Sequence, residues 1–189
     1  IEIAQEEIAQ NTAEGLLPVG LHVTTSDILV LYSLNLGTPV NEVGIYYFDD
    51  PETQDGEMNT LFSRGFVPMD ISHNDEGMYG LLVSAGLQVD GWQIVRLPYN
   101  VSTIEEVQVA LRERGLTPWG ISVHGNEALV LGLDESGDVE PREVALLSHG
   151  TRIDVYTEAI NHAVQQQELY PWGFSIIDNQ LLVQYIQND

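Results

Sequence analysis

Residues 115–121 read Gly115-Leu116-Thr117-Pro118-Trp119-Gly120-Ile121. The same pattern, a proline between apolar residues, occurs in three further segments: Gly15-Leu16-Leu17-Pro18-Val19-Gly20-Leu21, Gly65-Phe66-Val67-Pro68-Met69-Asp70-Ile71 and Glu168-Leu169-Tyr170-Pro171-Trp172-Gly173-Phe174. The prolines stand at positions 18, 68, 118 and 171, which gives spacings of 50, 50 and 53 residues. A regular period with matching flanks predicts tandem copies of one structural unit.

A helix is predicted before each proline. In the third copy, apolar residues recur at three- and four-residue spacing from Val101 to Leu111. Ser102 with Glu105 predicts a capping box there, Asp50-Pro51 predicts the start of the second helix, and Thr151 with Asp154 that of the fourth. Three glycines stand where a helix ends in a left-handed residue, and the proline prevents the helix from resuming; they are Gly15, Gly65 and Gly115.

A hairpin is predicted after each proline, and a further strand before each helix. The hairpin strands of the third copy are Trp119–Val123 and Ala128–Leu133, and those of the fourth are Trp172–Ile177 and Leu181–Ile186. The leading strands are Val43–Phe48, Trp92–Leu97 and Val144–Ser148. The unit is therefore β-α-β-β, and the first copy lacks its leading strand, which would lie upstream of Ile1.

These elements predict an α+β fold of four tandem units of roughly 50 residues, with helices packed on mostly antiparallel sheet. A second period of about 100 residues indicates two paired halves, residues 1–90 and 91–189. One continuous domain is the alternative. One continuous sheet and two abutting sheets are equally compatible with the sequence.

Charge is the strongest feature of the composition. The 189 residues include 29 Asp and Glu against six arginines and no lysine, a formal net charge of −23. Such a field repels nucleic acids and anionic membranes and attracts basic proteins and cations. The acidity alternatively serves solubility or adaptation to salt. No stretch is long and apolar enough to span a membrane, and the absence of cysteine excludes disulfides and fits a reducing compartment, so we expect a cytoplasmic protein.

Three tryptophans are candidate contacts for a ligand or a partner: Trp92, Trp119 and Trp172. Trp119 and Trp172 each follow a repeated proline, where the other two copies carry Val19 and Met69. Because this position stays apolar while its chemistry changes, we favour a core residue at the junction of helix and sheet over an aromatic binding platform.

No cofactor and no catalytic group are predicted. His22, His73 and His124 follow their prolines by four, five and six residues, so strand alternation sends them to different faces or into turns. Repeated units of this kind invite comparison with vicinal-oxygen-chelate metal enzymes, but the leading strands lack the His and Glu ligands. Two acidic loops, 49–57 and 134–140, also stand out, and the second has the oxygen ligands and turn glycine of a weak calcium site; we favour a solvated turn. Further candidates are the sequon Asn100-Val101-Ser102 and the pair Ser148-His149, for which we favour a helix cap and mere adjacency.

The segment Leu61-Phe62-Ser63-Arg64-Gly65-Phe66 with the hairpin Met69–Ser84 resembles the type III secretion chaperone fold and its YbjN-like relatives. These place a helix that ends in an apolar-glycine step before a pair of strands. The resemblance implies a dimerising, non-enzymatic binder of other proteins.

We therefore expect a non-enzymatic, acidic protein-binding or assembly factor of chaperone-like type, whose partner has a basic surface. A homodimer is one of the oligomeric states left open. Neither nucleic acid nor membrane is expected as a direct partner. One alternative is a small-molecule-binding or enzymatic domain with a cleft between the halves, which a pocket collecting the three tryptophans would support. A further alternative is a mimic of nucleic acid, with carboxylates at phosphate-like intervals.

Overall fold

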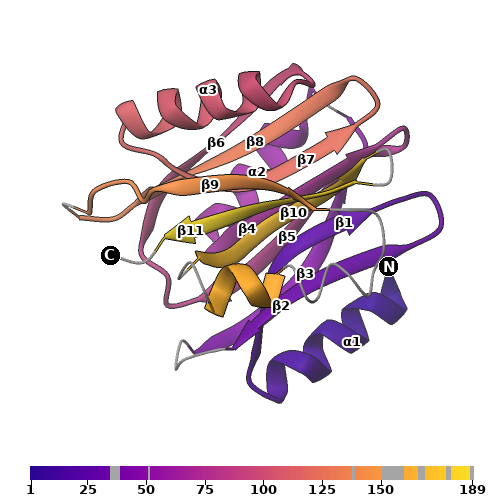
Figure 1. Ribbon diagram of the computed structural model, residues 1–189. Helices are drawn as coiled ribbons and strands as arrows, with labels where there is room; N and C mark the ends of the chain where they lie inside the picture. Colours follow the sequence, from indigo (N-terminus) through magenta and orange to yellow (C-terminus); the bar gives the residue numbers. More distant parts are fainter. Residues whose placement is uncertain are drawn as a thin grey trace.

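The computed structural model of the chain describes residues 1–34, 39–50, 52–137, 139–149, 160–165, 169–177 and 180–187 (Figure 1). Its elements are, in order, α1 (Glu2–Ala13), β1 (Leu16–Val23), β2 (Ile28–Leu34), β3 (Val40–Phe48), α2 (Gln54–Ser63), β4 (Phe66–Asn74), β5 (Gly77–Ala85), β6 (Val89–Pro98), α3 (Val101–Glu113), β7 (Thr117–His124), β8 (Glu127–Glu135), β9 (Val144–His149), β10 (Leu169–Ile177) and β11 (Gln180–Gln187). Residues 160–165 are helical. In the described residues, no helix is long and apolar enough to cross a membrane.

The fold is α+β, as expected, but its strands form four small antiparallel sheets. Three sheets have three strands, in the orders β3-β5-β4, β6-β8-β7 and β9-β11-β10, and the fourth pairs β1 with β2. In each three-stranded sheet the leading strand pairs with the second strand of the hairpin. The expectation of one sheet or two abutting sheets is therefore wrong, because the hairpins do not share a backbone ladder.

Each repeated proline lies inside the first strand of its hairpin, not before it. The four first strands, called here the inner strands, are β1, β4, β7 and β10. The pairing register shifts at one place in all of them: between Pro18 and Gly20, Pro68 and Asp70, Pro118 and Gly120, and Pro171 and Gly173. The residue after each proline is therefore the extra residue of a β-bulge, a position where a strand tolerates proline.

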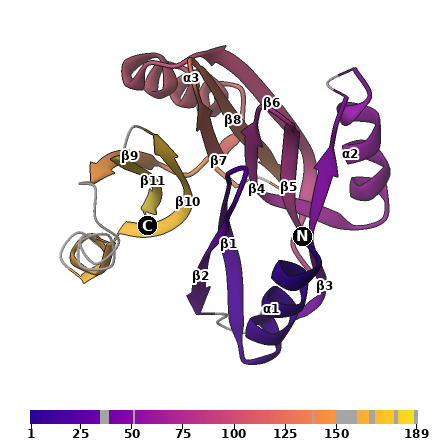
Figure 2. The same cartoon turned by 90° about the vertical axis from the view of Figure 1, so that its right-hand side faces the viewer.

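The inner strands meet one another in a closed ring. β1 contacts β4, β4 contacts β7, β7 contacts β10, and β10 contacts β1. Figure 2 shows these strands in the middle of the molecule, with α1, α2 and α3 at its periphery. Two strands of the ring, β1 and β4, come from the predicted half 1–90, and the other two, β7 and β10, come from the predicted half 91–189. The division into two halves stays a prediction.

The helix ends agree with the sequence better than the helix starts do. Gly15, Gly65 and Gly115 have φ values of 91°, 87° and 84°, which confirms the left-handed residue after each of the first three helices. The cap of α3 is the side chain of Asn100, which accepts from the Ser102 N–H, so the predicted Ser102 cap is wrong. Likewise, α2 begins at Gln54, after a turn in which Asp50 Oδ1 accepts from the Glu52 N–H. Thr151 and Asp154 lie outside the described residues.

The largest hydrophobic cluster joins hairpins from both predicted halves. It includes the bulge residues Val19, Met69 and Trp119, with Trp172 packed against it. The Trp119 and Trp172 rings meet edge to face at 4.8 Å between centroids. The bulge residues thus fill the interior beside the ring of inner strands.

Candidate functional site

Asp70 occupies the centre of the ring of inner strands. Its side chain is fully buried, in a position that Gly20, Gly120 and Gly173 occupy in the other three hairpins. Its carboxylate accepts backbone N–H groups from all four inner strands: Oδ2 accepts from Leu21 at 2.8 Å, Oδ1 accepts from Ile71 at 2.9 Å and Ile121 at 3.2 Å, and Phe174 contributes the fourth. The four donors are the residues that follow the central position in each hairpin. One carboxylate therefore satisfies four strands at once.

The glycines leave the space that this carboxylate fills. A Cβ atom added at Gly120 would overlap Asp70 Oδ1, and one at Gly173 would lie 3.3 Å from the Gly120 Cα and 3.4 Å from Asp70 Oδ1. Neither glycine has a positive φ, so close approach and not backbone conformation requires them. The centre thus has room for one side chain among four strands.

Two opposed effects act on the Asp70 carboxyl. Burial raises its pKa well above the ordinary value, because a charge in the interior loses its hydration. The backbone N–H groups of Leu21, Ile71, Ile121 and Phe174 act in the opposite direction by favouring the charged form. The donors converge on both oxygens, so the group is an acceptor that crosslinks the ring.

A second layer of hydrogen bonds is made by the next residue of each inner strand, which follows the backbone donor to Asp70. Here the side chain of one hairpin accepts an N–H from the neighbouring inner strand. Ser72 Oγ accepts from Val23, Ser122 Oγ from His73, and Ser175 Oγ from Val123, at 2.9, 2.9 and 2.8 Å. His22 Nδ1 closes the ring by accepting from the Ile176 N–H at 3.5 Å. Side-chain acceptors thus replace a backbone ladder between the inner strands.

Three histidines gather at one end of the ring. Strand alternation predicts them on different faces or in turns, and His124 is indeed the last residue of β7 before a turn. The His73 and His124 rings lie 5.9 Å apart, and His22 is close enough for its charge to interact with both. The pKa values of His22 and His73 are lowered to about 4, mainly by burial and in smaller part by the charge of His124, while Glu127 acts to raise that of His73. In the described part of the chain, no group of three or more His, Asp or Glu residues is arranged to hold a metal ion.

One contact chain has the residue types of a hydrolase triad. Ser122 Oγ lies 2.8 Å from His73 Nδ1, and His73 Nε2 lies 3.5 Å from Glu127 Oε1. Ser122 is only 2% exposed, and its oxygen already accepts the His73 N–H. A nucleophile must reach its substrate, so this serine is a crosslink of the ring.

Acid is expected to destabilise the fold through His22 and His73. Because their folded-state pKa is about 4 against an ordinary 6.5, the unfolded chain binds more protons than the folded chain in this window. The free energy of unfolding therefore falls as the pH drops from about 6.5 to about 4, and the contribution of these groups is constant below it. Urea unfolding near both ends of the window measures the change.

The control is His22→Ser, which copies the serine of the other three hairpins and removes one titrating group. Its loss of stability with acid should be smaller than that of the parent chain. An equal loss in both proteins would contradict the assignment to His22.

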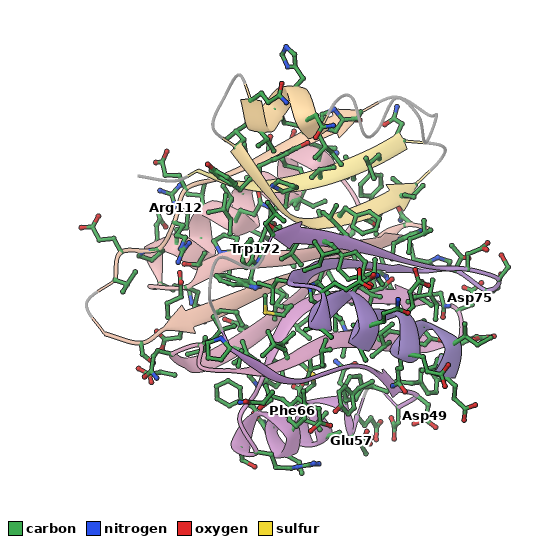
Figure 3. The ribbon with its side chains drawn as sticks, turned by 90° about the horizontal axis from the view of Figure 1, so that it is seen from below. Asp49, Glu57, Phe66, Asp75, Arg112 and Trp172 are labelled. Carbon is green, nitrogen blue, oxygen red and sulfur yellow. The ribbon has the colours of Figure 1, made fainter. Side chains whose placement is uncertain are left out.

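A polar cleft of about 210 Å³ lies beside the histidines; we call it the His73 cleft. Arg96 bridges two of its walls by donating to Glu127 Oε1 and to Gln54 Oε1, each at 2.9 Å. Asp49 and Asp75 line the cleft and, with Glu57, lie at the rim of the molecule in Figure 3. The one arginine of the cleft is thus already paired, and the cleft remains acidic.

The three tryptophans do not line the His73 cleft or the grooves beside α1 and α3. Trp119 is 3% exposed, and the half-buried Trp92 and Trp172 pack against the main hydrophobic cluster. Their role as ligand or partner contacts stays a prediction. The indole N–H groups of Trp119 and Trp172 are buried without an acceptor among the described residues.

The weaker candidates have structural uses where they are described. Asn100 caps α3, Ser148 Oγ donates to Gln180 at 3.4 Å, and His149 Nε2 contacts the Tyr185 hydroxyl at 2.8 Å. Glu135 of the second acidic loop accepts from Thr117 and Arg142. Asp138 of that loop lies outside the described residues.

The central Asp70 and the serine ring are the residues that sequence reasoning missed. Their signal is present once the four segments are aligned by proline: Gly, Asp, Gly, Gly two residues after it, and His, Ser, Ser, Ser four residues after it. One charged residue in an otherwise glycine position marks the centre of the ring.

The geometry therefore shows a buried polar axis centred on Asp70, and no metal-binding cluster among the described residues. Comparison of the chain with protein-family models, with curated proteins and with solved structures found no match.

Proposed function

We propose that the chain is a non-enzymatic, acidic protein-binding or assembly factor whose partner presents a basic surface. Its framework is four tandem β-α-β-β units, the first without its leading strand. The unit assignment is supported by registers that agree across 100 residues: Leu21 pairs with Val30 as Ile121 pairs with Val130. It is also supported by His22, Ser72, Ser122 and Ser175. Each stands four residues after its repeated proline and accepts a backbone N–H from a neighbouring inner strand.

The observation that carries the proposal is that four of the six arginines already have partners inside the molecule. Arg96, Arg112 and Arg142 bond Glu127, Glu143 and Glu135 at 2.9 to 3.0 Å. Arg64 lies over the Phe66 ring at 5.5 Å.

In the described residues, no arginine pairs with the carboxylates of α1 or α2. The carboxylates of α1 and α2 are therefore free of arginine ion pairs in the described residues. Their negative field would accelerate the approach of a basic partner.

A small-molecule site is less well supported. The described grooves are open hollows of about 210 to 440 Å³, and none of the three tryptophans lines them. A small-molecule site is usually an enclosed, mainly apolar cavity with a few converging polar groups. The surface offers carboxylates over a wide area instead.

The test is capture of partners by the immobilised chain from a lysate of its source organism, with elution by increasing salt. A captured protein is then purified, and its Kd is measured at about 50 and about 500 mM NaCl, where screening differs strongly. We expect a basic partner whose affinity falls at least about tenfold with salt. Binding indifferent to salt would contradict the proposal, and release of the partner by added DNA would favour the nucleic-acid mimic.

Two neutralising variants locate the contact. One carries Glu2→Gln, Glu6→Gln and Glu14→Gln on and beside α1; the other carries Glu52→Gln, Asp55→Asn and Glu57→Gln around α2. Each removes three charges, so the variant with the slower association identifies the surface that the partner meets.

A further inference from the structure

The strand β2 has an edge that is paired in the corresponding strands of the other sheets. β5, β8 and β11 each lie between an inner strand and a leading strand. Among the described residues, β2 pairs with β1 alone. The unpaired backbone groups of such an edge can bind another extended segment.

The sibling sheets show what a third strand places against β2. Ile28, Leu31 and Ser33 of β2 correspond to Ala128, Leu131 and Leu133 of β8, because both hairpins have the same register. The leading strand β6 sets Leu97, Ile94 and Trp92 opposite those three β8 residues. The leading strand β3 sets Phe48, Ile45 and Val43 at the same places on β5. A segment that fits β2 is therefore apolar at these three positions and runs antiparallel to β2.

The same comparison gives the segment a charge. Arg96 of β6 stands opposite Leu129 and donates to Glu127, the first residue of β8. Asp27 takes the place of Glu127 beside β2, where it is exposed and bonded to the neighbouring Ser26 hydroxyl. A cationic side chain opposite Leu29 would meet Asp27 as Arg96 meets Glu127. A second copy of the chain would bring another charge of −23, so charge favours a basic partner over self-association.

We propose that the β2 edge binds an extended segment of the basic partner protein by strand addition. The segment is apolar opposite Ile28, Leu31 and Ser33, and it carries Arg or Lys opposite Leu29. This inference rests on the proposed function and names the place and the conformation in which the partner is held.

The probe is a labelled peptide with the sequence of residues 91–99, which contains the β6 strand from Trp92 to Pro98. Fluorescence anisotropy measures its Kd for the intact chain, and amide hydrogen exchange locates it. We expect saturable binding with slower exchange in β2. Asp27→Lys should weaken binding about two- to fivefold, the range of an exposed ion pair, and a peptide carrying Arg96→Glu should bind this variant better than it binds the parent chain. Asp75→Lys, which changes another exposed carboxylate away from β2, is the matched control.

Several results would overturn the inference. These are absence of peptide binding, protection outside β2, and equal weakening by Asp27→Lys and Asp75→Lys. Slow amide hydrogen exchange of β2 in the absence of the peptide would also overturn the inference. In a dimer this result would mean that a second copy covers the β2 edge, and in a monomer that another segment of the same chain covers it. Salt-sensitive binding of a basic partner that leaves β2 exchange unchanged would overturn this inference and leave the proposed function standing.

Discussion

Replacing Asp70 by asparagine is expected to lower the free energy of unfolding by about 3 kcal/mol, within the range for losing buried charge-assisted hydrogen bonds. The two carboxylate oxygens accept backbone N–H groups from different strands. An asparagine must direct its NH2 group at one of these sets of donors, whichever way it turns. At least one strand then loses its acceptor in the interior. Urea unfolding followed by circular dichroism measures the change.

The matched control is Asp75→Asn, because Asp75 is also an aspartate but its side chain is 87% exposed. Its effect should stay within about 0.5 kcal/mol, as for most surface substitutions. If Asp70→Asn is as stable as the parent chain, the four backbone donors do not converge on the carboxylate and the description of the axis is wrong.

The sequence predicted the local elements because their causes are local. Period, proline and glycine identified the hairpins around Pro118 and Pro171, and the left-handed glycines end the first three helices where expected. Helix starts were less certain, since Asn100, Ser102 and Asp50 are all competent caps and their geometry decides among them.

The arrangement of the hairpins was not predictable in the same way. Alternation and spacing say which face a side chain takes, but not that four edges meet around one axis. The contact between Val23 and Ser72 joins residues 49 apart, and that between His22 and Ile176 joins residues 154 apart. A period of about 50 residues is as compatible with an open array as with a closed ring. The missed clue was the exception at Asp70, because a carboxylate among glycines needs donors from several strands at once.

The inner strands and β2 differ in how the backbone hydrogen-bonding groups along their edges find partners. Around the axis, strand edges are satisfied by Asp70, Ser72, Ser122 and Ser175, so that the inner strands need no further partner there. β2 has neither a leading strand nor such side chains on its outer edge among the described residues. Among the described residues, the inner strands are therefore closed around the axis, whereas β2, which has no leading strand beside it, keeps an outer edge without a pairing strand.

Moving the central carboxylate to another strand is expected to restore stability that its removal destroys. Asp70→Gly should cost about 4 kcal/mol or more, because it leaves backbone donors of four strands buried without an acceptor. Gly120→Asp alone should also destabilise the fold, since its Cβ would overlap Asp70 Oδ1 and bring a second carboxylate to the axis. In the double variant Asp70 Oδ1 is absent, so this overlap does not occur. The carboxylate is instead carried by residue 120, the position of β7 that corresponds to residue 70 of β4.

The loss of unfolding free energy in the double variant should therefore be smaller than the summed losses of the two single variants, by about 2 kcal/mol or more. A coupling of this size is typical of residues in direct contact. Urea unfolding of all four proteins completes the cycle. Gly91→Asp combined with Asp70→Gly is the control, because a Cβ at Gly91 meets nothing closer than 3.7 Å, in an outer strand away from Asp70. Additive costs in the Gly120 cycle would mean that Asp70 is held by its own strand and not by an axis that the four strands share, since a shared axis accepts the carboxylate from either β4 or β7.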